Sequence, residues 1–146
     1  MESKKISRRE FIKVTSTSTA AIALGSNLLQ CNSAQVLDPK GLPTKTFGKT
    51  GIQIPLIAFG TGSRWCSIKN EEEALNILTY ALDNGLFYWD TAHIYSNDSI
   101  ISEERLGKII KHRRNEIFLS TKISTRDPEE AKKHIELSLS RLQTDH

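Results

Sequence analysis

Three side chains capable of acid–base chemistry lie at or just after regularly spaced apolar segments of this 146-residue sequence. Asp90 ends the segment 86–89, Tyr95 follows five residues later, and Lys122 ends the segment 117–121. A free phenol titrates near pH ~10 and donates its proton poorly at neutral pH. A neighbouring ammonium stabilises the phenolate, and a carboxylate keeps that ammonium charged. The three groups therefore predict proton donation by Tyr95 to a carbonyl oxygen while a hydride arrives at carbon.

The elements that must bring these groups together repeat along the chain. Apolar runs predict strands that begin near residues 56, 86 and 117, a spacing of about 30 residues that suits one strand, one helix and two loops. A short hairpin around Gly48 and Gly51 precedes the first of them. Such units build a parallel sheet that is either doubly wound or closed as a barrel. No Gly-x-Gly-x-x-Gly follows the first strand, which disfavours the dinucleotide-binding doubly wound fold.

Local signals mark the ends of the predicted helices. Asn70 is typical of an N-cap, with Glu73 as its capping-box partner, and Gly85 suits a left-handed helix end. Asp127 and Pro128 open a third helix in the same way. The expected buried faces are apolar residues at helical spacing: Ala74, Leu75, Ile77, Leu78, Ala81 and Leu82, then Leu106, Ile109 and Ile110 in a helix from about 102 to 111, then Ala131, Ile135, Leu139 and Leu142.

Several motifs together resemble the signature of the aldo/keto reductase superfamily. They are Asp90-Thr91-Ala92-x-x-Tyr95 after Gly85, Ser102-Glu103-Glu104-x-Leu106-Gly107, the hairpin Phe47-Gly48-x-Thr50-Gly51, the strand end Gly60-Thr61-Gly62, and Leu119-Ser120-Thr121-Lys122. The resemblance covers about residues 45–146. It implies an α/β fold in which a hairpin and three βα units form the N-terminal portion of a TIM-type (β/α)8 barrel, left incomplete. It also implies a nicotinamide cofactor, NADP(H) or NAD(H).

The resemblance assigns a role to each residue at the predicted barrel mouth, where reactive residues gather at the strand ends. Tyr95 is implied as the general acid, Lys122 as the group that tunes it, and Asp90 as the partner of Lys122 near the nicotinamide. Gly60 and Thr61 match positions that approach the cofactor. The implied substrate is a small carbonyl compound or alcohol. The loop after Tyr95 is slightly longer than is usual in the family, which predicts a reshaped entrance.

The histidines are assigned more ordinary places. His93 lies at a variable position of the motif and is predicted to be a pocket or surface residue, whereas His112 and His134 are predicted to be solvated helix residues. The family orients its substrate with a histidine at the end of the fourth strand. His146 comes directly after the third predicted helix, so we do not assign it that role. Trp89 and Phe87 are predicted to pack inside the fold.

Residues 1–31 are predicted to be an export signal. Ser7-Arg8-Arg9-Glu10-Phe11-Ile12-Lys13 closely resembles the twin-arginine signal, and the apolar run 14–29 that follows is too short to span a bilayer comfortably. The alternative is a cytosolic protein with a Ser/Thr-rich start. The net charge of +3 belongs entirely to this segment. The rest of the chain is neutral, which argues against nucleic-acid binding.

The end of the signal has two interpretations. Leu28-Leu29-Gln30-Cys31 loosely resembles a lipoprotein cleavage box, with a lipid anchor at Cys31, although Gln30 stands where a small residue is expected. Asn32-Ser33-Ala34 is an alternative cleavage site. The Tat translocase is thus an expected partner, and the periplasm or its membrane surface the expected location. Residues 32–44 are predicted to be a linker before the partial barrel of 45–146. The two cysteines have no zinc-ligand spacing, and we predict no metal.

The region after the predicted linker holds three strand–helix units, whereas a closed barrel needs eight and typically ~250 residues. We therefore expect this chain to be truncated, unstable or aggregated when expressed alone, and inactive as a reductase. An alternative from another class is a non-enzymatic exported half-barrel that pairs with another chain through its sheet edges. A third possibility is a barrel aldolase that forms a Schiff base on Lys122.

Overall fold

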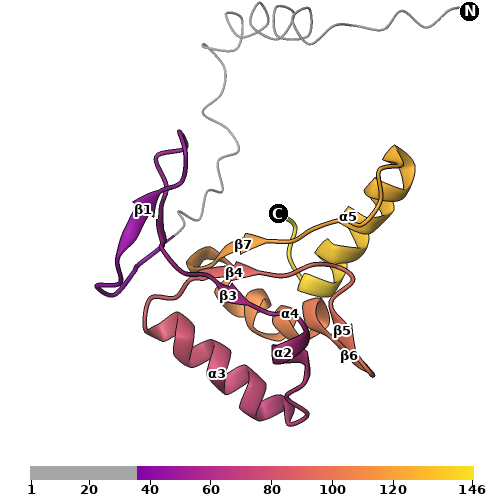
Figure 1. Ribbon diagram of the computed structural model, residues 1–146, viewed down its shortest axis with the longest axis horizontal. Coiled ribbons are helices and arrows are strands. Elements are labelled where there is room, and N and C mark those ends of the chain that lie inside the picture. The colour runs from indigo at the N-terminus through magenta and orange to yellow at the C-terminus, as the bar shows by residue number, and fades with distance from the viewer. Residues whose placement is uncertain (1–35) are drawn as a thin grey trace, which may run out of the picture. The chain divides into compact units, whose positions relative to one another are not determined.

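The structure, a computed structural model, describes residues 36–146, and the export signal and Cys31 lie outside them. Strands and helices alternate as predicted (Figure 1). The elements are β1 (Thr44–Thr46), β2 (Gln53–Pro55), β3 (Phe59–Gly60), α2 (Ser63–Cys66), α3 (Glu71–Asp83), β4 (Tyr88–Asp90), β5 (Ser96–Asn97), β6 (Ile100–Ile101), α4 (Ser102–Arg113), the 3-10 helix η2 (Arg114–Glu116), β7 (Phe118–Ser120) and α5 (Pro128–Leu142). Among these helices none is long and apolar enough to cross a membrane.

Strands β3, β4 and β7 form a parallel sheet in that order. Gly60 pairs with Asp90, and Asp90 pairs with Ser120, so the three strands end at the same level. The backbone pairing continues past these ends, because Thr61 N–H donates to Asp90 O at 2.9 Å and Thr91 N–H donates to Ser120 O at 2.8 Å. The register therefore brings the carboxyl ends of all three strands to one edge of the sheet, as the repeat predicted.

The first predicted strand is shorter than expected. The hairpin pairs Pro55 with Thr44, which draws residues 53–55 into an antiparallel ladder, and only Phe59 and Gly60 join the parallel sheet. Leu56 and Ile57, predicted to be strand residues, lie between the two ladders and are exposed. Apolar composition alone does not separate a strand from the connection between two strands, which is why the pattern placed the strand too early.

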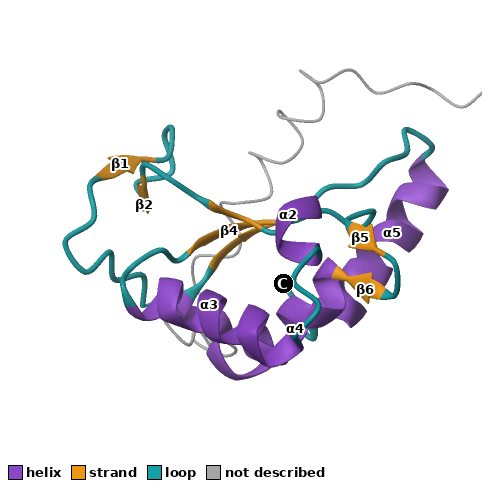
Figure 2. Cartoon of the chain, turned by 60° about the horizontal axis from the view of Figure 1, so that its bottom comes forward, coloured by secondary structure: helices purple, strands orange, loops and turns teal. Residues whose placement is uncertain are grey.

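Helices α3 and α4 lie on one side of the sheet and bury the core there (Figure 2). The α4 stripe is confirmed, since Leu106, Ile109 and Ile110 are all buried. Phe87 and Trp89 are fully buried in the same cluster, as predicted. In α3 the buried residues are Ala74, Leu78 and Leu82, whereas Ile77 is exposed. Strand β4 alternates accordingly, with Trp89 turned into the core and its two neighbours only half-buried.

The predicted N-caps of α3 and α5 and the left-handed glycine after α3 are confirmed, whereas no hydrogen bond from the Asn70 amide to the Glu73 side chain forms among the described residues. Asn70 accepts a hydrogen bond from Glu73 N–H at 3.1 Å, and Asp127 accepts from the first-turn amides of α5. Gly85 adopts φ +88°, and a Cβ at this position would lie 2.1 Å from Pro39 O. Both the left-handed backbone and the close approach of Pro39 require glycine there.

The prediction for the buried face of α5 is partly wrong. Leu142 is buried, but Ile135 is 51% exposed. The contacts of α5 with α4 involve its C-terminal part, where Gly107 allows close packing: a Cβ on Gly107 would lie 2.3 Å from Arg141 O. Among the described residues no element covers the N-terminal half of the apolar stripe, so helical spacing by itself overstated its burial.

Residues 36–43, which fall within the predicted linker 32–44, are docked on the domain. Val36 N–H donates to Asn115 O at 2.9 Å, Leu56 N–H donates to Pro43 O at 3.0 Å, and Leu37 packs against the core. The polar and turn-forming composition suited a loop, but composition does not distinguish a docked loop from a free linker.

Candidate active site

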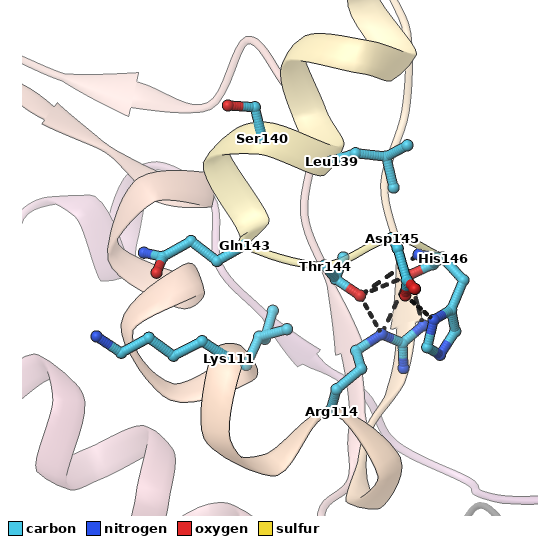
Figure 3. Close-up of a pocket in the computed structure, with 9 residues that line it drawn as sticks. Lys111, Arg114, Leu139, Ser140, Gln143, Thr144, Asp145 and His146 are labelled. Carbon is cyan, nitrogen blue, oxygen red and sulfur yellow. Dashed lines mark hydrogen bonds and ion pairs between the residues drawn. The ribbon is translucent and has the colours of Figure 1, made fainter. Parts of the chain in front are cut away.

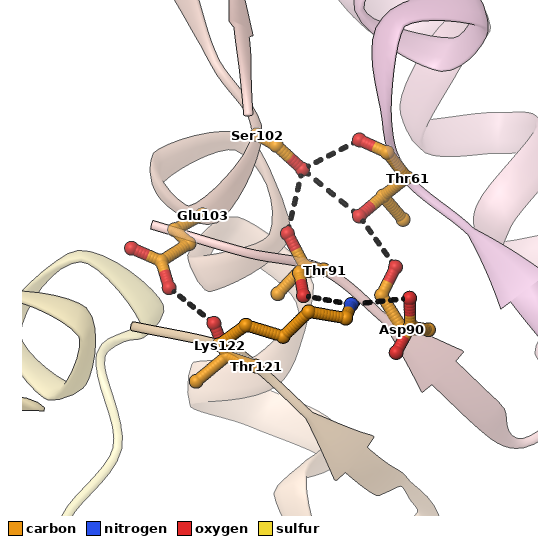
Figure 4. A network of polar contacts seen from close by, with 7 residues as sticks. All are labelled: Thr61, Asp90, Thr91, Ser102, Glu103, Thr121 and Lys122. Carbon is orange, nitrogen blue, oxygen red and sulfur yellow. Dashed lines mark hydrogen bonds and ion pairs between the residues drawn. The ribbon is translucent and has the colours of Figure 1, made fainter. Parts of the chain in front are cut away.

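Lys122 and Asp90 meet at the edge of the sheet where the parallel strands end (Figure 4). The Lys122 ammonium donates to Asp90 Oδ2 at 2.6 Å and to the carbonyl oxygen of Thr91 at 2.8 Å. Both side chains remain partly exposed, 48% for Lys122 and 32% for Asp90. An ion pair of this exposure contributes little to stability, at most about 1 kcal/mol. Its importance is therefore the fixed position that it gives to the ammonium.

Tyr95 lies beside this ion pair. The Lys122 Nζ is 5.3 Å from the centroid of the Tyr95 ring, within the range of a cation–π contact. A second neighbour is Gly62, where an added Cβ would lie 3.7 Å from the Tyr95 ring. A turn fixes the backbone, because Tyr95 N–H donates to Ala92 O and Tyr95 O accepts from Ser102 N–H, each at 2.9 Å. The three predicted catalytic residues are thus brought together at one edge of the sheet.

A buried set of hydroxyl groups supports this edge from below. Ser102 Oγ lies 2.8 Å from Thr61 O, and Thr91 Oγ1 lies 3.0 Å from Ser102 Oγ. Thr61 Oγ1 donates to Asp90 O at 3.1 Å. Since Ser102 has one hydroxyl proton, its donation to Thr61 O means that Thr91 donates to Ser102. All three hydroxyl side chains are fully buried, and together they tie the ends of β3 and β4 to the start of α4.

A buried carboxylate performs the same task for β7. Glu103 is fully buried, and its Oε1 accepts a hydrogen bond from Thr121 Oγ1 at 2.7 Å. Its other oxygen has no hydrogen-bond partner among residues 36–146, although Arg141 Nη1 is 3.8 Å away. A buried carboxylate requires such neighbours to offset its lost hydration. Because Thr121 precedes Lys122, α4 thereby fixes the strand end that carries the lysine.

The two residues predicted to approach a cofactor have different surroundings. Gly60 is exposed, and a Cβ built on it would have no atom within 4 Å, so its backbone faces open space beside Asp90. Thr61 is fully buried, and its hydroxyl is engaged with the Asp90 carbonyl. A planar group could therefore approach the backbone of Gly60. The buried side chain of Thr61 would not touch such a group, and it instead fixes the backbone of Asp90 through its hydrogen bond.

Two short elements beside Tyr95 were not predicted. Helix α2 buries Trp65 and Cys66 directly after Gly62, and the hairpin β5–β6 forms in the loop that the sequence marked only as slightly long. The hairpin docks on the segment after α2, because Asn97 Nδ2 donates to Ser67 Oγ at 3.3 Å. An ion pair between Lys69 and Asp98 adds to this contact. The turn-forming Asn97-Asp98-Ser99, followed by Ile100 and Ile101, was the available sequence signal.

The burial of Cys66 raises the pKa of its thiol above the usual value of 9.0. The side chain is fully buried, and burial disfavours the charged thiolate. Cys66 is thus a packing residue rather than a reactive nucleophile. Within the described part of the chain, no group of three His, Cys, Asp or Glu side chains is arranged to hold a metal ion.

His134 is not the solvated helix residue that was predicted. Its ring stacks on His93 with 4.1 Å between the centroids, and its Nδ1 is buried without a hydrogen-bond partner in the described residues. His93 in turn lies 3.1 Å from Lys122 O through its Nδ1. Nothing in the sequence pattern links these two positions, because the contact depends on how α5 folds back over the strand ends.

His146 lies near the start of β7, whereas Lys122 follows its end. Arg114 donates both to His146 O, at 3.0 Å, and to Ile117 O, at 2.8 Å. Arg114 and His146 border a concave pocket of about 490 Å³ between the C-terminal ends of α4 and α5 (Figure 3). The imidazole of His146 contacts Asp145 at 2.6 Å rather than any predicted catalytic residue.

Comparison with known proteins places this arrangement in a family. The sequence model of the aldo/keto reductase family matches residues 56–146. The oxidoreductase YrpG of Bacillus subtilis is 32% identical over 118 residues, which cover 68% of this chain and 36% of the relative. A probable voltage-gated potassium channel subunit beta of Arabidopsis thaliana is 32% identical over 117 residues, covering 70% of this chain and 34% of the relative. The chain therefore belongs to the aldo/keto reductase family.

Solved structures agree with this assignment. An aldo-keto reductase from Klebsiella pneumoniae, solved in complex with NADPH, matches with a TM-score of 0.59 and 28% identity, covering 66% of this chain and 34% of the other. The structural neighbours are (β/α)8 barrels, and the described residues supply a hairpin and three parallel strands of that fold. The chain spans about a third of the length of these curated relatives.

Proposed function

We propose that this chain carries part of the active site of a nicotinamide-dependent carbonyl reductase. One observation supports this above all: the Lys122–Asp90 ion pair lies beside the Tyr95 ring at the ends of adjacent parallel strands. Each group alone has an ordinary structural explanation, as a cap or a solvated strand end. Their convergence on one edge of the sheet is what a proton-donating site requires.

The proposed chemistry assigns one task to each side chain. A bound nicotinamide cofactor, NADP(H) or NAD(H), supplies the hydride. Tyr95 gives its phenolic proton to the carbonyl oxygen, and the ammonium of Lys122 stabilises the negative charge left on the phenol oxygen. Asp90 and the carbonyl of Thr91 hold that ammonium. The open backbone at Gly60, where an added Cβ would meet no atom of the described residues within 4 Å, fits the approach of a flat ring.

A matched pair of tyrosine variants tests the proposal. In a protein that joins these residues to the remaining strands of the barrel, Tyr95→Phe should lower kcat/KM for NADPH-dependent reduction of a simple aromatic aldehyde by about 10²–10⁴-fold, the usual contribution of a general acid. Tyr88→Phe is the control, since Tyr88 packs edge-to-face on Phe118 with a centroid distance of 5.2 Å. The assay follows the loss of NADPH absorbance. Equal activity of the two variants would disprove the role of Tyr95.

We further propose that residues 36–146 do not complete this site by themselves. They contribute three parallel strands, and the family's substrate-orienting histidine is not among the residues that meet at the strand ends. The described residues alone are thus expected to be inactive, and unstable because both outer edges of the sheet lack partners. Nicotinamide turnover by a monomeric, cooperatively unfolding fragment of these residues would contradict this expectation.

A non-enzymatic assembly role is the second candidate. It is favoured by exposed apolar side chains along both edges of the sheet, Leu56 and Ile57 near β3, and Ile123 and Ile135 near β7 and α5. The relative named a potassium channel subunit beta indicates that the family includes proteins named for an assembly. Association of the purified chain with another chain, lost when Ile57 and Ile123 become Lys, would favour this role.

We also propose export by the Tat route, from the sequence of residues 1–31 alone. The periplasm, or the membrane surface if Cys31 is lipidated, is the resulting location. Replacing Arg8 and Arg9 with Lys should retain the protein inside the cell. Export that is unchanged by this double substitution would exclude the proposed route, and palmitate labelling that survives Cys31→Ala would exclude the anchor.

A further inference from the structure

His93 lies between helix α5 and the strand end that carries Lys122. Its ring stacks on that of His134 at 4.1 Å and an interplanar angle of 28°. Its Nδ1 is 3.1 Å from Lys122 O, and its Nε2 is 3.4 Å from Ser124 Oγ. Arg141 Nη1 donates to the carbonyl oxygen of His93 at 3.0 Å. Both ring nitrogens, one ring face and the backbone carbonyl are therefore in contact with neighbouring groups.

The chemistry of these contacts fixes the proton on the His93 ring. A carbonyl oxygen can only accept a hydrogen bond, so Nδ1 must carry a proton to bond with Lys122 O. In the neutral ring Nε2 is then the acceptor, and the Ser124 hydroxyl can donate to it. The arrangement thus selects the neutral Nδ1–H tautomer.

A metal site is the obvious alternative for two adjacent histidines. The rings are nearly parallel, so the nitrogen lone pairs lie in neighbouring planes and do not converge on one point. Nδ1 of His93 carries a proton and cannot coordinate. No third ligand joins the two rings among residues 36–146. The stacked pair is therefore a packing contact with one directed hydrogen bond.

The hydrogen bond from the His93 ring fixes the backbone of Lys122, the residue whose ammonium pairs with Asp90. Lys122 O accepts from both the backbone N–H of His93, at 3.3 Å, and the His93 ring. At the other end of the same residue, Asp90 and Thr91 hold the ammonium. A lysine side chain has four rotatable bonds, so the ammonium is positioned only if its backbone end is also fixed.

We propose that His93 is a positioning residue for Lys122, and that α5 holds His93 in place through His134 and Arg141. His93 touches no reacting group, and its effect is transmitted through the backbone of Lys122. The inference rests on the proposed reductase function for its purpose, but its geometry can be tested without turnover. Helix α5 would then have two roles, because it packs on α4 and also holds the turn before Tyr95 through the contacts of His134 and Arg141 with His93.

The first experiment uses the unmodified full chain. Long-range ¹H–¹⁵N NMR reports the tautomer of each neutral imidazole. The spectra are recorded at about pH 8.5, roughly two units above the pKa of ~6.5 of a free histidine. The proposal requires His93 to be an Nδ1–H tautomer, whereas free histidine in water favours Nε2–H. An Nε2–H signal from His93 would overturn it, and this measurement does not depend on any variant folding.

The second experiment separates the hydrogen bond from the stacking. His93→Asn keeps a donor near the position of Nδ1 but removes the ring, whereas His93→Phe keeps the ring and removes the donor. Trace acetylation followed by peptide mass spectrometry measures the reactivity of Lys122 relative to Lys132, an exposed lysine on α5. The ratio should rise about threefold in His93→Phe, a small factor because exposed ion pairs are weak, and return toward the original value in His93→Asn.

The outcomes distinguish this inference from the proposed function. A ratio that is unchanged in His93→Phe, or that rises more in His93→Asn, would overturn the positioning role even if the protein reduces carbonyls. The predicted ratios would support the positioning of Lys122 even if Tyr95→Phe left the activity of the completed barrel unchanged, which is the result that would overturn the proposed function. If both variants unfold, the tautomer of the unmodified chain decides the question.

Discussion

The direction of hydrogen bonding in the buried hydroxyl set predicts unequal effects of two substitutions. Ser102→Ala removes the donor to Thr61 O and also the acceptor of the Thr91 hydroxyl. A lost hydrogen bond costs about 1 kcal/mol and an unpaired buried donor about 1–3 kcal/mol, so we expect a loss of about 3 kcal/mol. Thr91→Val removes only a donor, and Ser102 keeps its own acceptor. We expect a loss of about 1 kcal/mol.

The double variant makes the test sharper. In the Ser102→Ala background the Thr91 hydroxyl has no acceptor, so Thr91→Val should be neutral or stabilising, with a coupling of about 1–2 kcal/mol. Urea unfolding followed by circular dichroism gives each free energy of unfolding, provided that the m-value is constant. Ser140→Ala is the control, because Ser140 is exposed on α5. Equal costs for the two single variants, or strict additivity, would refute the assigned direction.

Three further predictions concern packing and pH. Gly107→Ala should destabilise the fold by about 1–3 kcal/mol, because its Cβ would lie 2.3 Å from Arg141 O; an unchanged urea midpoint would contradict this. Burial raises the pKa of the Cys66 thiol, so the contribution of the buried thiol to the free energy of unfolding is complete below pH 9.0 and is lost as pH rises. The difference in free energy of unfolding between the unmodified chain and Cys66→Ala should therefore shrink from about pH 7.5 to about pH 10. The guanidinium of Arg113 lowers the pKa of Glu116, so the contribution of the Glu116 carboxylate to the free energy of unfolding is present above pH 4.5 and is lost as pH falls. The difference in free energy of unfolding between the unmodified chain and Glu116→Gln is below about 1 kcal/mol for so exposed a pair, and it should vanish in acid.

The sequence predicted burial and helix ends best where local spacing alone determines them. The α4 stripe was correct because it packs against the sheet and α3 within the described residues, so helical spacing and burial coincide. The N-cap of α3 was correct because Asn70 and Glu73 interact locally. Ile135 was wrong, since burial of the outer part of α5 depends on elements that the described residues do not supply.

In the candidate site, too, the sequence predicted some contacts and not others. Asp90 and Lys122 could be paired from the strand spacing, because parallel strands end at one edge. The supporting contacts could not, since Thr61 and Ser102 are 41 residues apart and neither residue type predicts its partner. His93 and His134 meet only because α5 folds back over the strand ends. Positioning contacts of this kind require the tertiary structure.

A double-mutant cycle in kcat/KM on Tyr95 and Lys122 tests the central claim most directly. The cycle is measured in a protein that joins these residues to the remaining strands of the barrel. If the phenol and the ammonium act as one proton-donating unit, Tyr95→Phe and Lys122→Met will each reduce NADPH-dependent aldehyde reduction severely, and the double variant will be about as impaired as the worse single variant. If the reduction in the double variant equals the product of the two separate reductions, the groups act independently, and the proposed site is wrong.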